Sequence, residues 1–116
     1  MSKITRTEPG ALYAKSVEYH NFVYLPGLTA TDTSKDIAGQ TAEILAAIDA
    51  ALEANGTDNT RLLTAQIWLK DIKDRDAMNK VWAAWLPKDE APVRVCVQAA
   101  LADPAQLIEI QVMACK

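Results

Sequence analysis

The sequence predicts an α+β fold in which two helices cover one face of a single, mostly antiparallel sheet. Apolar residues recur at the helical period in two stretches, 37–52 and 78–85. Other stretches rich in β-branched and aromatic residues predict strands and give the order β-β-α-β-α-β-β. The 116 residues, half of them hydrophobic, are enough for one domain with its own core, so we assign residues 1–116 to a single domain.

The first half of the chain is expected to form a hairpin and then the longer helix. Only His20 and Asn21 separate the strands expected at 16–19 and 22–25, which favours a tight turn. A short leading strand near Ile4 is an optional addition. Polar residues in 32–36 can cap the start of the helix, and the glycine of Asn55-Gly56 predicts its end. One mostly apolar stripe is expected to face the core: Ile37, Thr41, Ile44, Leu45, Ile48 and Leu52.

The second half is expected to contain a central strand, the shorter helix and two closing strands. In the strand 62–69, alternation separates Leu63, Ala65, Ile67 and Leu69 from Leu62, Thr64, Gln66 and Trp68. Charges alternate in sign over residues 70–76, which is typical of a solvated turn. A helical face then follows and ends before Pro87: Met78, Val81, Trp82 and Trp85. The closing strands are 93–99 and 107–115, joined by a turn at 102–105.

Alternation in the closing strands predicts two different sheet faces. The valines at 93, 95 and 97 and the isoleucine side of the last strand are expected to meet the helices. Arg94, Cys96 and Glu109 then fall on the other face, together with Trp68 and several glutamines. That mixture is too apolar for a wetted face and too polar for a core. We therefore expect another subunit of a symmetric homo-oligomer to cover it.

Composition and motifs exclude several classes of function. A net charge of −3 without a basic stripe argues against nucleic-acid binding, and no apolar run approaches the roughly 20 residues of a membrane span. The N-terminus has no apolar segment typical of a signal peptide, so we expect a cytoplasmic protein. His20 is the only histidine, the two cysteines lack CxxC spacing, and no phosphate loop or dinucleotide motif is present. We expect no metal and no cofactor.

Arg94 and Glu109 are the candidate chemical groups of the second sheet face. A guanidinium can hold a carboxylate through two parallel hydrogen bonds, and a carboxylate can orient a water molecule or move a proton. The alternative interpretation is a cross-strand salt bridge between the two side chains, which would be weakly stabilising because desolvation offsets the attraction.

The same residues carry a resemblance to a known family. The segment Ala91-Pro92-Val93-Arg94-Val95-Cys96-Val97, followed by Leu107-Ile108-Glu109-Ile110, resembles the C-terminal signature of the RidA (YjgF, L-PSP) family. The segments 78–82 and 16–27 resemble its second helix and its opening hairpin. The resemblance spans nearly the whole chain and is closest to the YoaB-like branch.

This resemblance implies a chorismate-mutase-like fold and a homotrimer with a site at each subunit interface. It implies hydrolysis of reactive 2-imino and enamine acids, such as 2-aminoacrylate, to 2-oxo acids and ammonia, without metal or cofactor. By position, Arg94 would bind the substrate carboxylate and Glu109 would position or activate water. Gly27 would lend backbone to the pocket, Cys96 would line it, and Tyr13 falls where the family has a pocket tyrosine.

Two departures from the family pattern lie in the expected pocket. The family's Gly-Pro-Tyr-Ser-Gln is Ala11-Leu12-Tyr13-Ala14-Lys15 here, and its Ser-Gly is Pro26-Gly27. Substrate preference and the strength of deamination therefore stay open, and Tyr13 can also be interpreted as an ordinary strand aromatic. The alternative functions are a non-catalytic trimer that binds small carboxylates or a protein partner, and, last, an endoribonuclease or translation inhibitor.

Overall fold

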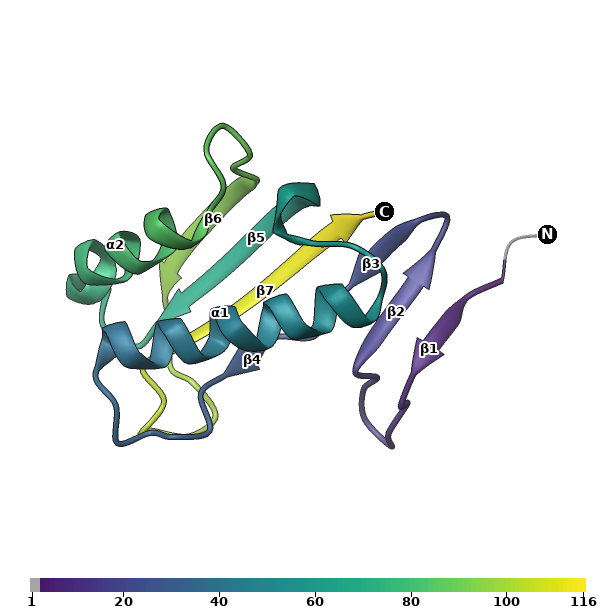
Figure 1. Ribbon diagram of the computed structural model, residues 1–116. Helices are drawn as coiled ribbons and strands as arrows, with labels where there is room; N and C mark the ends of the chain where they lie inside the picture. Colours follow the sequence, from purple (N-terminus) through teal and green to yellow (C-terminus); the bar gives the residue numbers. More distant parts are fainter. Residues whose placement is uncertain (1–2) are drawn as a thin grey trace.

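Residues 3–116 of the computed structural model form one sheet with two α-helices on the same side of it (Figure 1). The strands are β1 (Thr5–Thr7), β2 (Ser16–Tyr19), β3 (Phe22–Tyr24), β4 (Leu28–Thr29), β5 (Leu62–Leu69), β6 (Val93–Gln98) and β7 (Ile108–Cys115). The helices are α1 (Ile37–Ala54) and α2 (Arg75–Trp85), and short 3-10 turns at Asn59–Arg61 and Ile72–Asp74 precede β5 and α2. The predicted α+β architecture is confirmed, and no helix of these residues is long and apolar enough to cross a membrane.

The sheet follows the strand order β1-β2-β3-β7-β5-β6, with the short β4 also paired to β7. All neighbouring strands are antiparallel except β5 and β6, which run parallel. Parallel neighbours need a crossover connection, and α2 provides it by returning the chain from the end of β5 to the start of β6 (Figure 1). This crossover places α2 over the edge of the sheet that carries Arg94.

Local sequence signals set the element boundaries as predicted. His20 and Asn21 both have positive φ, 51° and 66°, which is the backbone of a two-residue hairpin turn matched to the twist of β2 and β3. Asp36 caps α1 by accepting a hydrogen bond from the Gly39 amide at 2.9 Å. Gly56 has a φ of 76° just beyond the C-terminus of α1, where an L-residue with a side chain would be strained.

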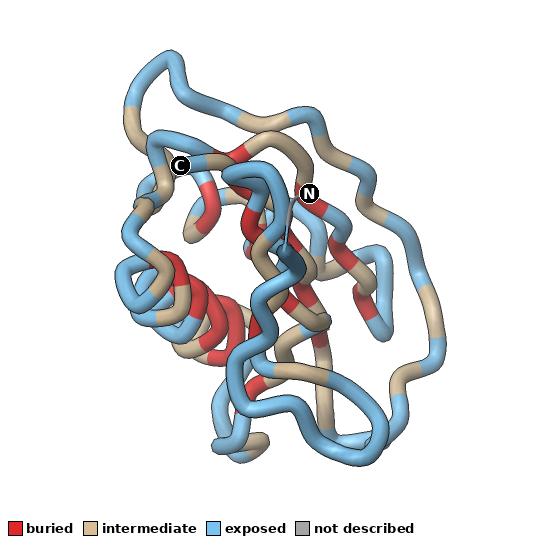
Figure 2. The backbone as a smooth tube through the Cα atoms, turned by 90° about the vertical axis from the view of Figure 1, so that its right-hand side faces the viewer, coloured by how far each residue is buried: buried red, intermediate tan, exposed pale blue. Residues whose placement is uncertain are grey.

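The hydrophobic core lies between the helices and one sheet face (Figure 2). Ile44, Ile48 and Leu52 of α1 are at most 1% exposed, as are Ile67 of β5 and Ile110 of β7. Burial of each such side chain contributes roughly 1.5–3 kcal/mol of transfer free energy. The buried polar residue Gln40 accepts from the Leu107 amide at 2.9 Å and donates to the Lys35 and Ala105 carbonyls at 3.1 and 3.3 Å. Its side chain thereby ties α1 to the loop that precedes β7.

The predicted orientation of β6 is wrong. Arg94 and Cys96 are opposite Ala65 and Ile67 of β5, whose side chains are buried beneath the helices, so they share the helix-covered face. Val93, Val95 and Val97 instead share the opposite face with Thr64, Gln66 and Trp68, and are 72%, 56% and 47% exposed. Apolar valines on this edge strand therefore face away from the helices, because pairing with β5 fixes which side chains share a face.

Two smaller differences concern β4 and β5. The prediction did not include β4, which pairs Leu28 with Ile110 and Thr29 with Glu109 beyond the interruption at Pro26-Gly27. In β5, a bulge between Leu62 and Thr64 shifts the alternation, so Leu62 is 7% exposed and joins the core rather than the opposite face. The residues 64–69 keep the predicted alternation.

The sheet surface opposite the helices is called the open face below. It is defined by Phe22 and Tyr24 of β3, Thr64, Gln66 and Trp68 of β5, Val93, Val95 and Val97 of β6, and Glu109, Gln111 and Met113 of β7. Phe22 and Tyr24 are 39% and 40% exposed. The predicted presence of a second, half-apolar face holds, although its membership differs: Arg94 and Cys96 are replaced by three valines.

Candidate active site

The side chain of Arg94 lies between β6 and α2. Its Nη1 donates a hydrogen bond to Oδ1 of Asn79 at 2.8 Å, and its Cζ lies 5.6 Å from the centroid of the Trp82 ring. This geometry is within the range of a cation–π contact. Arg94 is half-buried, and it forms no ion pair with an acidic residue of the segment 3–116. The guanidinium is therefore oriented by two neutral side chains and keeps donors available for an anionic ligand.

Cys96 lies two residues further along β6 on the same face as Arg94. Its thiol is free and half-buried, and it packs against the hydrophobic core. Two residues along a strand correspond to roughly 7 Å. Arg94 and Cys96 thus project from the same side of β6.

Glu109 and Gly27 form a second candidate group on the other side of the sheet. Glu109 is half-buried on β7, beside Thr29 of β4 and Trp68 of β5. A Cβ atom added to Gly27 would lie 2.2 Å from Oε2 of Glu109, so only glycine permits this contact. A side chain at position 27 would therefore displace the Glu109 carboxylate.

Arg94 and Glu109 do not meet within one chain. Arg94 is in register with Ala65 of β5 and Ala65 with Val112 of β7, three residues beyond Glu109. The two positions are separated by roughly 10 Å along the strands and roughly 10 Å across them. Their side chains also project from opposite faces. The expectation that the two share one sheet face is wrong, and so is the alternative of a cross-strand salt bridge.

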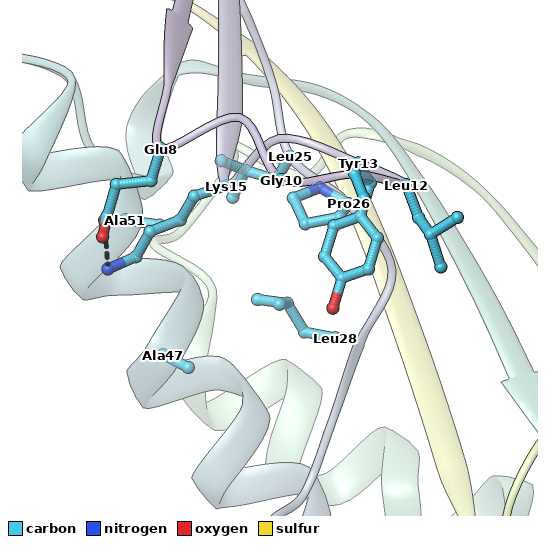
Figure 3. Close-up of a pocket in the computed structure, with 11 residues that line it drawn as sticks. Glu8, Gly10, Leu12, Tyr13, Lys15, Leu25, Pro26, Leu28, Ala47 and Ala51 are labelled. Carbon is cyan, nitrogen blue, oxygen red and sulfur yellow. Dashed lines mark ion pairs between the residues drawn. The ribbon is translucent and has the colours of Figure 1, made fainter.

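Tyr13 belongs to the loop between β1 and β2 rather than to a strand, which contradicts its interpretation as an ordinary strand aromatic. It is 71% exposed and lines a cavity of about 620 Å³ between this loop and α1 (Figure 3). Pro26 lies beside Tyr13, and an ion pair of 3.1 Å between Glu8 and Lys15 lies at the other end (Figure 3). The remaining lining is mostly aliphatic: Leu12, Leu25, Leu28, Ala47 and Ala51. Pro26-Gly27 links this cavity to Glu109.

Sequence reasoning missed Asn79 as a site residue and assigned Trp82 to the core alone. Both face Arg94 from α2, three residues apart and therefore on one side of the helix. Trp82 is 6% exposed, so it belongs to the core and to the site at once. The available signal was Asn79 itself, since asparagine is a weak helix former and a helical asparagine often makes a specific hydrogen bond.

The carboxylates with clearly lowered pKa values lie away from these groups. Hydrogen bonds from the Thr31 amide and then from Asp32, Thr31 and Lys35 lower the pKa of Glu43, against the opposing effect of burial. Bonds from Ser34 lower the pKa of Asp32, and bonds from Thr60 lower that of Asp58. These three groups stabilise loops and turns. Among residues 3–116 no cluster of three or more histidine, cysteine, aspartate or glutamate side chains could hold a metal ion.

Comparisons with known proteins give one consistent relationship. The model of the family described as endoribonuclease L-PSP matches residues 3–116. The chain is 40% identical over 111 residues to the RutC family protein YoaB of Escherichia coli strain K12, and 96% of each chain is covered. It is 34% identical over 108 residues to the 3-aminoacrylate deaminase RutC of Acinetobacter baylyi, with 88% of this chain and 85% of that protein covered.

A solved structure agrees with this relationship. The crystal structure of NMB1025, a member of the YjgF protein family from Neisseria meningitidis, superposes with a TM-score of 0.94 at 35% identity. The match covers 98% of this chain and 95% of that chain. The similarity thus extends over the whole described fold, including both candidate groups.

Proposed function

Because the chain belongs to the endoribonuclease L-PSP family, also called the RidA or YjgF family, we propose that it hydrolyses reactive 2-imino and enamine acids to 2-oxo acids and ammonia. 2-Aminoacrylate is the example that the sequence resemblance suggested. The relative from Acinetobacter baylyi is named as a deaminase of 3-aminoacrylate, which is also an unsaturated amino acid with a carboxylate. The observation that carries the proposal is Arg94, whose guanidinium is held by Asn79 and Trp82 and has no acidic partner in the described chain.

Hydrolysis of an imine mainly requires that the substrate and a water molecule are held in position. Arg94 grips the substrate carboxylate, which fixes the adjacent imine carbon. Glu109 accepts a proton from a water molecule whose oxygen attacks the carbon of the protonated imine and forms a tetrahedral carbinolamine. Glu109 then returns this proton to the nitrogen, the C–N bond breaks and ammonia leaves. The carbinolamine hydroxyl releases its own proton to solvent and becomes the carbonyl of the 2-oxo acid. The reaction consumes one water molecule and needs no oxidant or cofactor.

This assignment requires more than one copy of the chain, since Arg94 and Glu109 lie on opposite faces of the sheet. We propose a homotrimer in which Arg94 and Cys96 of one copy face Gly27, Glu109 and Tyr13 of a neighbour. The exposed valines and aromatic residues of the open face favour such an assembly, because they would bury apolar surface in it. We further propose that the trimer acts in the cytoplasm on small carboxylates and binds neither nucleic acid nor membrane.

Of the positions that differ from the family pattern, Pro26 bears most directly on substrate preference. A proline at this position has no hydroxyl and no backbone N–H, so it cannot donate a hydrogen bond beside Glu109. Together with Leu12, Leu28 and Tyr13 it makes the adjoining cavity apolar. We therefore expect imines derived from amino acids with apolar side chains to be preferred over polar ones.

The test is ammonia release from freshly generated 2-aminoacrylate, measured in a coupled assay. Arg94→Ala is expected to lower kcat/KM by at least a hundredfold, because it removes the carboxylate contact, while the oligomer stays intact. Arg61→Ala serves as the matched control, since the Arg61 guanidinium donates to the Lys116 carbonyl at 2.9 Å rather than to a residue of the candidate site. Equal turnover by wild type and Arg94→Ala would exclude Arg94 from the mechanism.

Two further measurements separate the alternative functions. Stabilisation of the protein by pyruvate without any turnover would indicate a carboxylate-binding trimer that is not an enzyme. Arg94-dependent cleavage of RNA by nuclease-free protein would support the endoribonuclease activity that the family name describes.

A further inference from the structure

The two side chains that contact the Arg94 guanidinium, Asn79 and Trp82, are both uncharged. Asn79 offers an amide oxygen 2.8 Å from Nη1, and the Trp82 indole offers a ring face 5.6 Å from Cζ. A guanidinium has five N–H donors in a planar fork. One of them is used by Asn79, so the remaining edge can still form the paired hydrogen bonds that a carboxylate accepts.

Asn79 and Trp82 stand on α2, which is anchored by buried side chains and a hydrogen bond. Trp82 is 6% exposed and its ring lies 5.3 Å from that of Trp85, at an interplanar angle of 46°. Trp85 in turn donates through Nε1 to Oδ2 of Asp49 on α1 at 3.0 Å. Met78, one position before Asn79, is fully buried. The two groups that contact Arg94 therefore stand on a helix that is anchored to the core and to α1.

We infer that Asn79 and Trp82 are positioning residues for Arg94, and that the neutrality of residue 79 keeps the guanidinium charge available for a carboxylate ligand. This inference rests on the proposed function for the identity of the ligand, but it concerns the binding step alone. An aspartate at position 79 would hold the same place with a negative charge. It would pair with Arg94 internally and compete with the ligand.

The central experiment compares Asn79→Asp with wild type in two measurements, the Kd of pyruvate by calorimetry and the KM and kcat for 2-aminoacrylate. Pyruvate is the 2-oxo acid formed by hydrolysis of 2-aminoacrylate. We expect Asn79→Asp to raise both Kd and KM at least tenfold while kcat changes less than threefold and the melting temperature does not fall. If Asn79 had a merely structural role, Asn79→Asp would lower the melting temperature instead. It would not raise KM while leaving kcat nearly unchanged.

Gln98→Glu is the matched control for added charge. Gln98 lies on β6, on the same face as Arg94 and four residues further along, which is roughly 13 Å away. Its Oε1 accepts from the Ile72 amide at 2.9 Å, a contact that a glutamate can keep. The inference expects this variant to bind pyruvate within threefold of wild type. An equal loss in Gln98→Glu and Asn79→Asp would attribute the effect to net charge and overturn the inference.

Substitutions of Trp82 test its ring contact with Arg94 independently of Asn79. Trp82→Phe keeps an aromatic face and is expected to raise KM no more than threefold, whereas Trp82→Leu removes that face and is expected to raise it about tenfold. Equal KM values for the two variants would exclude the ring contact.

The outcomes distinguish this inference from the proposed function. Pyruvate binding that Asn79→Asp weakens, in a protein without turnover, would support the positioning role and contradict the enzyme. Turnover with unchanged KM in Asn79→Asp would support the enzyme and contradict the positioning role. A wild-type protein that neither binds pyruvate nor turns over 2-aminoacrylate would contradict both.

Discussion

The two faces of the sheet are built from the same strands but differ in how their apolar side chains are used. On the covered face, Ile67 and Ile110 are fully buried beneath the helices. On the open face, Val93 and Val95 are more than half exposed, although they are equally apolar. Apolar side chains of the same sheet thus lie in two different environments. The covered face accounts for the fold of one chain, and the open face is a surface that only another molecule can bury.

The candidate residues follow the same division. Arg94 and Cys96 lie on the covered side at the edge of the sheet, and Glu109 lies on the open side in contact with Gly27. Neither face contains a complete set of groups for imine hydrolysis. Under the proposed function, one copy would therefore supply only part of the site.

The largest effect is expected on the covered face. Ile67→Ala removes a fully buried side chain and should lower the free energy of unfolding by about 2–5 kcal/mol, through lost transfer energy and the cavity left behind. Gln66→Ala, at the exposed neighbouring position on the open face, should change it by no more than about 0.5 kcal/mol. Denaturant unfolding of both variants measures the difference. Similar losses would mean that the two faces are equally buried.

A smaller effect is expected from charge on the open face. Val95→Glu should weaken self-association at least tenfold, about 1.4 kcal/mol, because an unpaired carboxylate would have to be desolvated between copies. Sedimentation equilibrium or light scattering measures the mass of the assembly. Ala46→Glu, on the exposed side of α1, adds the same charge outside the sheet and should leave the mass unchanged. An unaltered mass of Val95→Glu would place the interface elsewhere.

The smallest effect concerns the loop that leads from β4 to α1. Glu43 accepts from the Thr31 amide at 2.5 Å and from the Asp32 amide at 3.3 Å, and these bonds lower its pKa below the ordinary 4.5. A lowered carboxylate pKa gives stability that is present above pH 4.5 and is lost as the pH falls through the folded-state pKa.

Glu43→Gln should therefore have a lower melting temperature than wild type at neutral pH and a shallower fall in acid, so that the two curves converge at low pH. Melting temperatures measured across the acid range test this, with Glu53→Gln at an exposed position of α1 as the control. Parallel curves for wild type and Glu43→Gln would remove Glu43 from the acid response.

Periodicity and turn chemistry predicted most of the fold. The hairpin turn at His20 and Asn21, the ends of α1, and the bounds of β5 all follow from local residue choice. Alternation also identified which residues of β6 share a face, but not which face the helices would take. That choice depends on the register of β6 against β5, a contact between distant parts of the sequence, and hydrophobicity alone gave the opposite answer.

The sequence identified most residues of the candidate site but not how they are arranged in space. Arg94 and Glu109 were proposed from the strand pattern and from the family resemblance, whereas Gly27, Cys96 and Tyr13 were proposed from the resemblance alone. The roles of all five remain proposals. The close approach of Gly27 to Glu109 is a tertiary contact that no local pattern encodes. The contact of Asn79 with Arg94 likewise depends on the crossover that lays α2 against β6.

The buried amide of Gln40 couples two segments that are 65 or more residues apart in sequence. Its bonds to Ala105 and Leu107 hold the loop between β6 and β7 against α1. Since this loop can detach only when those bonds break, its opening should follow the opening of the helix rather than occur alone. The Leu107 amide should then exchange its proton with solvent as slowly as the amides in the middle of α1, despite lying outside any helix or strand. The strand that carries Arg94 would thereby be held at its far end by the same unit that forms the core.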